Sequence, residues 1–248
     1  MDWKRDKWPW YGRLFYRGSN YLTAVFPSAV VFDNIFTKEY FEKKFRKHFY
    51  FIPYGAEVKE PAHDTSILDK LDVDPEKYIL FVGRFIPDKG IHLLVRAFES
   101  VATDMKLVLV GGSPNPDNYE DEIHRTQDKR IIFAGYVYGD DTNILMKNAY
   151  MYVQPSLIEG LSPVILTVMG LGTPLVCSDI VENKFITGDN ATHFISGNSD
   201  SLAQKINYCL DNPEKLKQMA EDGKADILAR FNWDSVASQY LELFKRKK

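Results

Sequence analysis

From residue 78 onward, short apolar runs rich in β-branched residues alternate with longer segments of helical periodicity. Each run is continuously apolar, which is typical of strands buried on both faces of a parallel sheet. The expected strands span residues 78–84, 106–111, 130–135, 150–155 and 173–179. Helices are expected between them at 90–103, 119–128, 142–148 and 163–171. The alternation predicts βαβ units and therefore an α/β protein with a doubly wound parallel sheet.

The residues that follow each expected strand are the first place to look for a site. Ligands of doubly wound sheets bind beyond the carboxyl ends of the strands. Several runs end directly in Gly or Asp, as the turn after a buried strand requires. A tail of three further helices is expected at 199–210, 213–230 and 233–244.

The first sixty residues differ from the rest in charge and in pattern. Residues 1–60 carry eleven Lys and Arg against seven Asp and Glu, whereas the remainder carries twenty against twenty-seven. Helices are expected here at 3–26 and 37–45, and strands at 29–32 and 50–53. Because so few elements do not make a self-sufficient domain, we interpret residues 1–60 as a remnant of one α/β domain with the start of a linker. Residues 61–248 form the main domain, and helix 233–244 is expected to pack back on the amino-terminal part.

Composition and charge exclude several classes of protein. The 45% apolar content is that of a folded globular chain, and the net charge of -3 argues against a nucleic-acid partner. Cys177 and Cys209 have no second Cys or His at ligand spacing, so neither a disulfide framework nor a zinc site is expected. No signal peptide is recognised, and the apolar stretch 162–177 is too short and too broken by Gly and Pro to span a membrane. We therefore expect a cytoplasmic protein.

The segment FVGRFIPDKG, residues 81–90, carries the strongest chemical signal. Gly83 ends a buried strand, Arg84 offers a planar fork for paired oxygens, and Lys89 adds a charge near the start of the next helix. Together with free N–H groups at that helix start, these residues suit a phosphate. Two solvated surface charges are the alternative interpretation. No Walker or Gly-x-Gly-x-x-Gly motif is present.

A second signal lies in QPSLIEGLSPVILTVMGLGTPLVCSD, residues 154–179. Glu159 follows a buried strand and precedes a helix that begins near Ser162. A carboxylate at this place suits the recognition of hydroxyl groups, with the N–H groups of Gly160 and Leu161 beside it. The alternative is an ordinary capping loop, with Ser162 as the cap and Glu159 exposed to solvent.

Together these segments resemble a known family. FVGRFIPDKGIHLLVRAF, LVLVGG, RIIFAGYV and PSLIEGLSPVILTVMGLGTPLVCSD are similar, in order and spacing, to the carboxyl-terminal half of a family 4 glycosyltransferase of the GT-B fold. The resemblance continues to the terminal FNWDSVASQYLELF. The amino-terminal MDWKRDKW, AVVFDN and FIPYGAEV are similar to the end of the acceptor domain in the rhamnosyltransferase-like branch, in which further residues come first.

The resemblance implies a Rossmann-like donor domain that binds a nucleotide-diphospho sugar. Arg84 and Lys89 match the family residues that hold the diphosphate and neutralise the charge that develops on the leaving group. The main chain around Tyr136 and Val137 would meet the nucleotide base. Glu159 matches the first member of a pair of glutamates and would face the donor sugar.

The second glutamate of that pair is replaced here by Thr167. In the family this carboxylate grips the ribose hydroxyls, and Thr is shorter, neutral and monodentate. One interpretation is that the donor nucleotide carries deoxyribose, as a thymidine-diphospho sugar does.

Other candidates carry less chemistry. Asp72 and Asp74 have the spacing of a metal-binding pair but precede a proline in the linker, and no metal or cofactor is expected. The aromatic and basic segment 3–17 suits peripheral contact with a membrane, or packing within its own domain. The histidines have no partner at catalytic spacing and are interpreted as structural; they are His48, His63, His92, His124 and His193.

The function predicted is transfer of a sugar from a nucleotide-diphospho sugar to a saccharide or lipid-linked acceptor, with retention of configuration, in polysaccharide biosynthesis. The inner face of a membrane is the alternative location. One rival is a nucleotide-sugar binding module, or a truncated or degenerate glycosyltransferase, without activity of its own. Thr167 and the short acceptor part favour this rival. A dimer, or a separate amino-terminal half as partner, would complete such a chain. An epimerase of the same fold is a weaker rival, because no His or carboxylate constellation suggests proton abstraction.

Overall fold

The computed structural model describes residues 9–56, 58–61, 64–113 and 118–245. The chain divides into two compact units. The smaller unit contains the described residues up to Tyr54 and those from Asp234 onward, and the larger unit is Gly55–Trp233.

The larger unit is built on one six-stranded sheet in the order β5-β4-β3-β6-β7-β8, with every neighbouring pair parallel. The strands are β3 (Tyr78–Val82), β4 (Lys106–Val110), β5 (Ile131–Gly135), β6 (Met151–Gln154), β7 (Leu175–Ser178) and β8 (Thr192–Phe194). All residues of β6 and β7 are buried, in keeping with their continuously apolar sequence. The expected α/β class and doubly wound sheet are confirmed.

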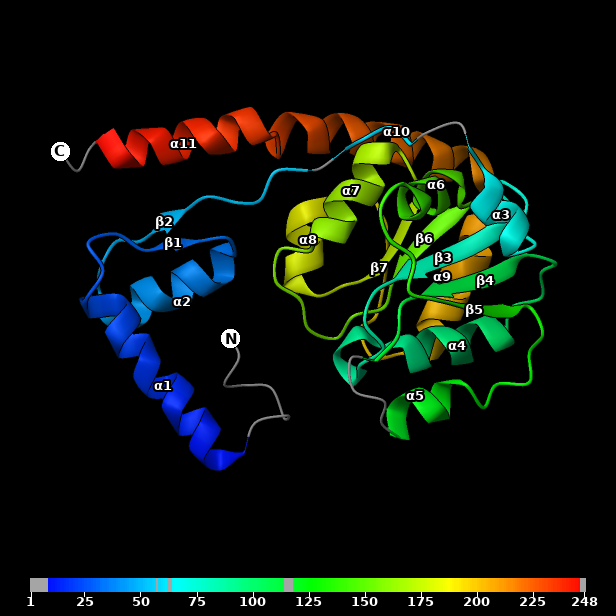
Figure 1. Ribbon diagram of the computed structural model, residues 1–248, viewed down its shortest axis with the longest axis horizontal. Coiled ribbons are helices and arrows are strands. Elements are labelled where there is room, and N and C mark those ends of the chain that lie inside the picture. The colour runs from blue at the N-terminus through cyan, green and yellow to red at the C-terminus, as the bar shows by residue number, and fades with distance from the viewer. Residues whose placement is uncertain (1–8, 57, 62–63, 114–117, 246–248) are drawn as a thin grey trace. The chain divides into compact units, whose positions relative to one another are not determined.

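Helices cover both faces of this sheet (Figure 1). One face packs against α3 (Ser66–Lys70), α6 (Asp140–Asn148), α7 (Pro163–Leu171), α8 (Val181–Thr187) and α10 (Pro213–Arg230). The other packs against α4 (Ile91–Glu99), α5 (Asn118–Ile123) and α9 (Ser199–Asp211). Successive strand residues alternate between the two cores, so Leu80 and Tyr152 lie in the first and Phe81 and Val153 in the second.

The strand order places a topological switch point at the centre of the sheet. The chain runs outward from β3 through β4 to β5 and then returns to β6 on the other side of β3. β3 and β6 are neighbours in the sheet, but the chain after β3 leads to α4 on one face and the chain after β6 leads to α7 on the other. Open α/β sheets bind ligands in the crevice at such a point.

Three elements of the larger unit were not expected from the sequence: α3, α8 and β8. All three are short, and the sequence THF of β8 has too few residues for a recognisable period. Among the described residues, no helix is long and apolar enough to cross a membrane.

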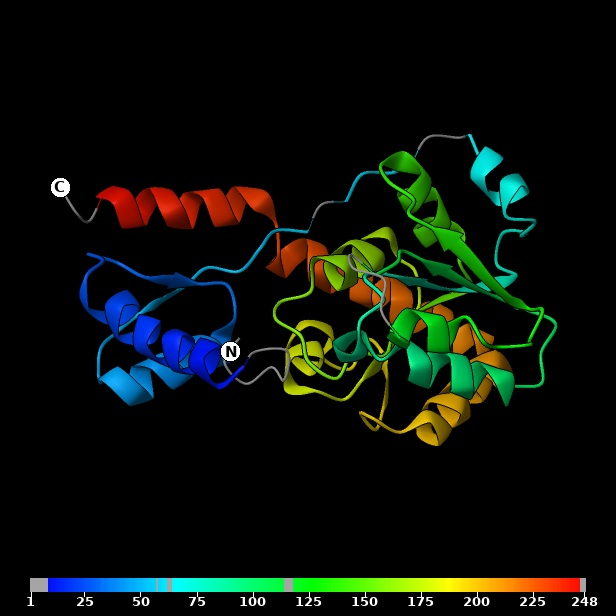
Figure 2. The same ribbon diagram turned by 60° about the horizontal axis from the view of Figure 1, so that its bottom comes forward.

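The smaller unit is a narrow α/β assembly (Figure 2). It contains α1 (Trp10–Val25), β1 (Val31–Phe32), α2 (Ile35–Phe45), β2 (Tyr50–Phe51) and α11 (Trp233–Lys245), of which Trp233 itself belongs to the larger unit. The side chain of Asn34 caps α2 by accepting a hydrogen bond from Thr37 N. The two strands pair in parallel, with α1 and α2 on one face and α11 on the other.

The boundary between the two units lies between Tyr54 and Gly55, a few residues before the boundary between residues 60 and 61 that the sequence suggested. The segment that was expected to be a linker is bound to the larger unit. Ala56 N donates to Phe231 O over 2.6 Å, and Lys59 forms an ion pair with Asp140. Residues 55–60 therefore count as part of the larger unit rather than as a free connection.

Candidate functional site

Arg84 is presented by a firmly held turn at the end of β3. Gly83 N donates to Val110 O over 2.9 Å and Phe85 N donates to Gly112 O over 3.0 Å, so the main chain is fixed on both sides of Arg84. The Phe85 ring is buried, whereas the Arg84 side chain is exposed. Within the described residues the Arg84 guanidinium has no hydrogen bond or ion pair, which leaves it available to an anion.

Lys89 is directed across the switch point by a close contact of two loops. It ends the 3-10 turn Pro87–Lys89, and Gly90 follows at φ +67° as the cap of α4. A Cβ on Gly90 would lie 2.2 Å from Pro155 O, so only glycine lets the two backbones approach. Leu157 N also donates to Asp88 O over 2.8 Å. These contacts fix the loop of Lys89 against the loop after β6.

Glu159 receives several hydrogen bonds on one oxygen. Its Oε1 forms an ion pair with Lys89 Nζ and accepts from Gln154 Nε2 over 2.6 Å and from Ser156 Oγ over 2.7 Å. The Glu159 side chain is only 9% exposed and that of Lys89 19%, so the pair is largely shielded from water. The structure thus brings together the lysine and the glutamate that the two sequence segments supplied separately. Glu159 is held in place rather than freely exposed.

The start of α7 adjoins this cluster. Gly160 is exposed, Leu161 and Ser162 are buried, and Pro163 occupies the first turn of α7. Ser162 lies at the cap position but its side chain makes no capping hydrogen bond, so the capping alternative has no support from its hydroxyl. In the described part of the chain, the N–H groups of Gly160 and Leu161 donate to no partner.

Thr167 lies within α7, one turn beyond Pro163, and is half-buried. Its hydroxyl makes no hydrogen bond to the Glu159 cluster or to any other described residue. The structure therefore places Thr167 on the helix that begins at the site, but not within the hydrogen-bonded cluster.

Tyr136 and Val137 follow β5, which is separated from β6 in the sheet by β4 and β3. Gly111 N donates to Gly135 O over 2.7 Å, which ties this segment to the end of β4. The Tyr136 ring is exposed and stacks on Tyr138 with an interplanar angle of 3°. The Val137 carbonyl accepts from Thr142 Oγ1 over 2.9 Å. Both predicted residues thus lie at the same edge of the sheet as Arg84, and neither contacts Glu159.

Sequence reasoning missed two buried residues behind the cluster, Tyr152 and Gln154. Tyr152 OH lies 3.0 Å from Val82 O and 2.9 Å from Gln154 Oε1. Burial raises the pKa of the Tyr152 phenol, which therefore stays protonated. The available signal was Gln154 itself, a polar residue ending the otherwise apolar run 151–154.

A further buried chain of hydrogen bonds supports the loop after β6 from the side of β7. Ser178 Oγ donates to Ser156 O, and Asn183 Nδ2 donates to Ser178 Oγ over 3.0 Å. Next to them, Thr187 Oγ1 lies 2.9 Å from His193 Nε2. Burial lowers the pKa of His193. These contacts agree with a structural role for this histidine.

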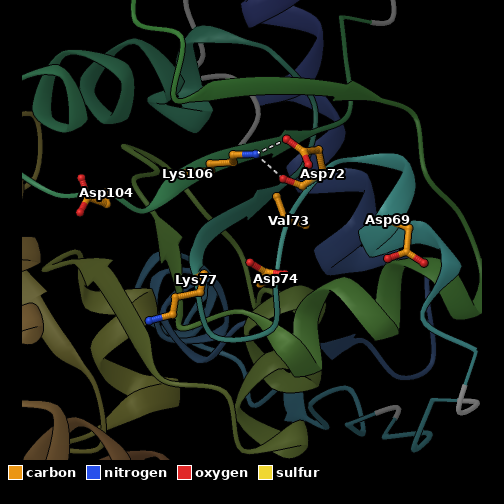
Figure 3. Close-up of a pocket in the computed structure, with 7 residues that line it drawn as sticks. All are labelled: Asp69, Asp72, Val73, Asp74, Lys77, Asp104 and Lys106. Atoms are coloured by element: carbon orange, nitrogen blue, oxygen red, sulfur yellow. Dashed lines mark hydrogen bonds and ion pairs between the residues drawn. The ribbon is translucent and has the colours of Figure 1, made fainter.

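Asp72 and Asp74 line a surface hollow of about 410 Å³ at the opposite, amino-terminal edge of the sheet. Figure 3 shows the Asp72 carboxylate turned toward Lys106, with which it forms an ion pair of 2.7 Å. That lysine lowers the pKa of Asp72. Within the described residues, no group of three or more His, Cys, Asp or Glu side chains could hold a metal ion.

The six-stranded parallel sheet, with these loops at its switch point, has the architecture of the GT-B type, and comparisons with known proteins agree. Residues 65–226 match the family model described as "Glycosyl transferases group 1". The chain belongs to this family of glycosyltransferases.

The two relatives and the solved structure described below are longer than this chain. An uncharacterized glycosyltransferase of Methanocaldococcus jannaschii is 30% identical over 181 residues, which are 69% of this chain and 45% of the relative. The alpha-maltose-1-phosphate synthase of Mycolicibacterium smegmatis is 27% identical over 75% of this chain and 52% of its own length. Anabaena HepE, solved with UDP and glucose, matches with a TM-score of 0.84 at 22% identity, over 93% of this chain and 66% of HepE. The chain thus spans about half the length of the curated relatives that it matches.

Proposed function

We propose that the larger unit binds a nucleotide-diphospho sugar and that the protein transfers the sugar to a saccharide or lipid-linked acceptor. The observation that carries this proposal is the pairing of Lys89 with Glu159 at the switch point, beside the unpaired and exposed Arg84. Family membership and a neighbour solved with UDP and glucose support it.

The proposed roles follow from charge and position. Arg84 and Lys89 would hold the diphosphate and stabilise the negative charge that grows on it as the glycosidic bond breaks. Glu159 would accept a hydrogen bond from a sugar hydroxyl, and the N–H groups of Gly160 and Leu161 would bind next to it. Two positive side chains supply the charge that a metal supplies elsewhere, so we propose that transfer needs no metal or cofactor.

For the reaction we propose retention of configuration. The acceptor hydroxyl would attack the anomeric carbon from the face that the diphosphate leaves, and its proton would pass to an oxygen of the departing phosphate. The bond from sugar to phosphate breaks as the bond to the acceptor oxygen forms. No separate protein base is then required. The exposed segment of Tyr136 and Val137 would meet the base of the nucleotide.

The partners on the acceptor side remain proposals. Exposed apolar side chains follow one side of α1; they are Trp10, Tyr11, Leu14, Phe15, Tyr21, Leu22 and Val25. A membrane in contact with residues 3–17, a second copy of the chain and a separate amino-terminal half would each cover such a surface, and residues 3–8 lie outside the described part. A cytoplasmic location, at the inner face of a membrane, and a role in polysaccharide biosynthesis belong to the same proposal.

Calorimetric titration of the purified chain with UDP, GDP, ADP and dTDP tests the donor site. We expect one nucleotide to bind and the binding to be lost in Arg84→Ala. Arg125→Ala is the matched control. Arg125 is also an exposed arginine, but it follows α5 and belongs to neither of the two segments that form the site. A folded wild-type chain that binds none of the four would contradict the proposal and favour the degenerate rival, in which Thr167 has abolished recognition of the nucleotide.

A further inference from the structure

Gln154 occupies the last position of β6 and is 1% exposed. Its amide makes hydrogen bonds on both sides. Nε2 donates to Glu159 Oε1 over 2.6 Å and to Ser156 Oγ over 2.8 Å, while Oε1 accepts from Tyr152 OH. A carboxylate can only accept, so the NH₂ group must face Glu159 and the amide has one possible orientation.

Tyr152 joins this amide to β3, the strand that precedes Arg84. Its hydroxyl lies within 3.4 Å of Val82 N and 3.0 Å of Val82 O, and Val82 is the last residue of β3. The phenol has one proton, which it donates either to Val82 O or to Gln154 Oε1, so one hydroxyl links the strand to the amide. The main chain before Arg84 and the carboxylate of Glu159 are therefore connected through two buried side chains.

The network leaves the two oxygens of Glu159 in different states. Oε1 receives Lys89, Gln154 and Ser156, which fills its capacity as an acceptor. No described residue donates to Oε2. An incoming hydroxyl group thus meets one free oxygen on a carboxylate that cannot rotate without breaking three hydrogen bonds.

We propose that Gln154 is a positioning residue for sugar recognition: it fixes Glu159 so that Oε2 alone accepts from a hydroxyl of the donor sugar. The inference rests on the proposed function and deepens it. Because Gln154 is 1% exposed, it would act on the sugar through Glu159 and would not contact the nucleotide. Its contribution therefore belongs to the affinity for the sugar ester and not to the affinity for the free nucleoside diphosphate.

The test compares these two affinities in Gln154→Met, which keeps the length of the side chain and removes its hydrogen bonds. Calorimetry is done with the nucleoside diphosphate that the wild-type chain binds best and with its glucose, galactose and mannose esters. We expect the best-bound ester to lose about tenfold in affinity, while the free nucleoside diphosphate stays within about twofold. Gln218→Met is the matched control, because Gln218 is an exposed glutamine on α10, bonded only to Asp222.

Tyr152→Phe is the second variant and removes a single oxygen atom. It leaves the amide of Gln154 in place but frees its carbonyl, so we expect a smaller loss, about threefold, again confined to the ester. Melting followed by circular dichroism shows whether each variant is folded. This variant keeps the test decisive if Gln154→Met does not fold.

The possible outcomes separate the inference from the proposed function. Equal losses for ester and free diphosphate, or no loss for either, would overturn the inference and leave the nucleotide site intact. A wild-type chain that binds all esters no more tightly than the free diphosphate would overturn it as well. A wild-type chain that binds no nucleotide would contradict the proposed function, and with it the inference that rests on that function.

Discussion

At the scale of single residues, Lys89 and Glu159 carry opposite charges in a place with little water. Removing the lysine leaves the carboxylate with two neutral donors, Gln154 and Ser156. We expect Lys89→Met to lower the free energy of unfolding by about 1–3 kcal/mol, measured by urea denaturation at neutral pH. Glu159→Gln in the same chain should recover part of the loss, because no unpaired charge remains.

The matched control for this prediction is Lys59→Met. Lys59 pairs with Asp140 over 2.9 Å, but both side chains are well exposed. Exposed pairs contribute about 0–1 kcal/mol, so this variant should stay close to the wild type. Equal effects of the two substitutions would mean that the Lys89 pair is open to solvent.

Thr167 provides a second prediction at this scale. The resemblance places a carboxylate here that grips ribose, and the structure places Thr167 on α7, which begins beside Glu159. We expect the wild-type chain to bind dTDP at least as tightly as UDP. Thr167→Glu should shift the ratio toward UDP by about tenfold, because a hydrogen bond to a charged acceptor contributes about 1.5–3 kcal/mol. Calorimetry with both nucleotides measures the ratio, and a strong preference of the wild type for UDP would exclude a deoxyribose donor.

At the scale of elements, the approach of two loops at Gly90 decides where Lys89 lies. Alanine at this position would have to adopt a left-handed backbone conformation, and its Cβ would clash with Pro155 O. We expect Gly90→Ala to cost more than about 2 kcal/mol of stability and to weaken nucleotide binding. Gly172→Ala is the control, since Gly172 caps α7 in the same left-handed region at φ +79° but meets only the flexible side chain of Lys224. Similar urea midpoints for the two variants would show that the contact with Pro155 relaxes easily.

The strands that are buried along their whole length were predictable from the sequence. The strands β3, β4, β5, β6 and β7 were predicted within a few residues, because a run that is apolar on both faces has few alternatives to a buried strand. The short β8 and α8 are stabilised by packing against the completed sheet, and no local sequence pattern predicts such packing. The rule that ligands bind beyond the strand ends directed attention to the segments of Lys89 and Glu159, but their ion pair was not predicted. The roles of Gln154 and Tyr152 did not, because hydrogen-bond partners depend on distances that only the folded chain sets.

At the scale of the whole molecule, the two units differ in how much core they possess. The larger unit has a buried cluster on each face of its sheet, whereas the clusters of the smaller unit contain only three buried residues each. A two-stranded parallel sheet adds little stability of its own. The smaller unit should therefore open without global unfolding of the larger one.

Native-state hydrogen exchange, read by mass spectrometry, tests this difference. We expect amides of α1 and α2 to exchange at least about tenfold faster than those of β3, β4 and β6, which lie in the centre of the larger sheet. Adding the nucleotide that the chain binds should slow exchange in the loops after β3 and β6 and leave α1 and α2 unchanged, because binding stabilises only the unit that holds the ligand. Uniform protection across both units would mean that the chain folds as one cooperative body, and that its smaller unit is stabilised by more than its own core.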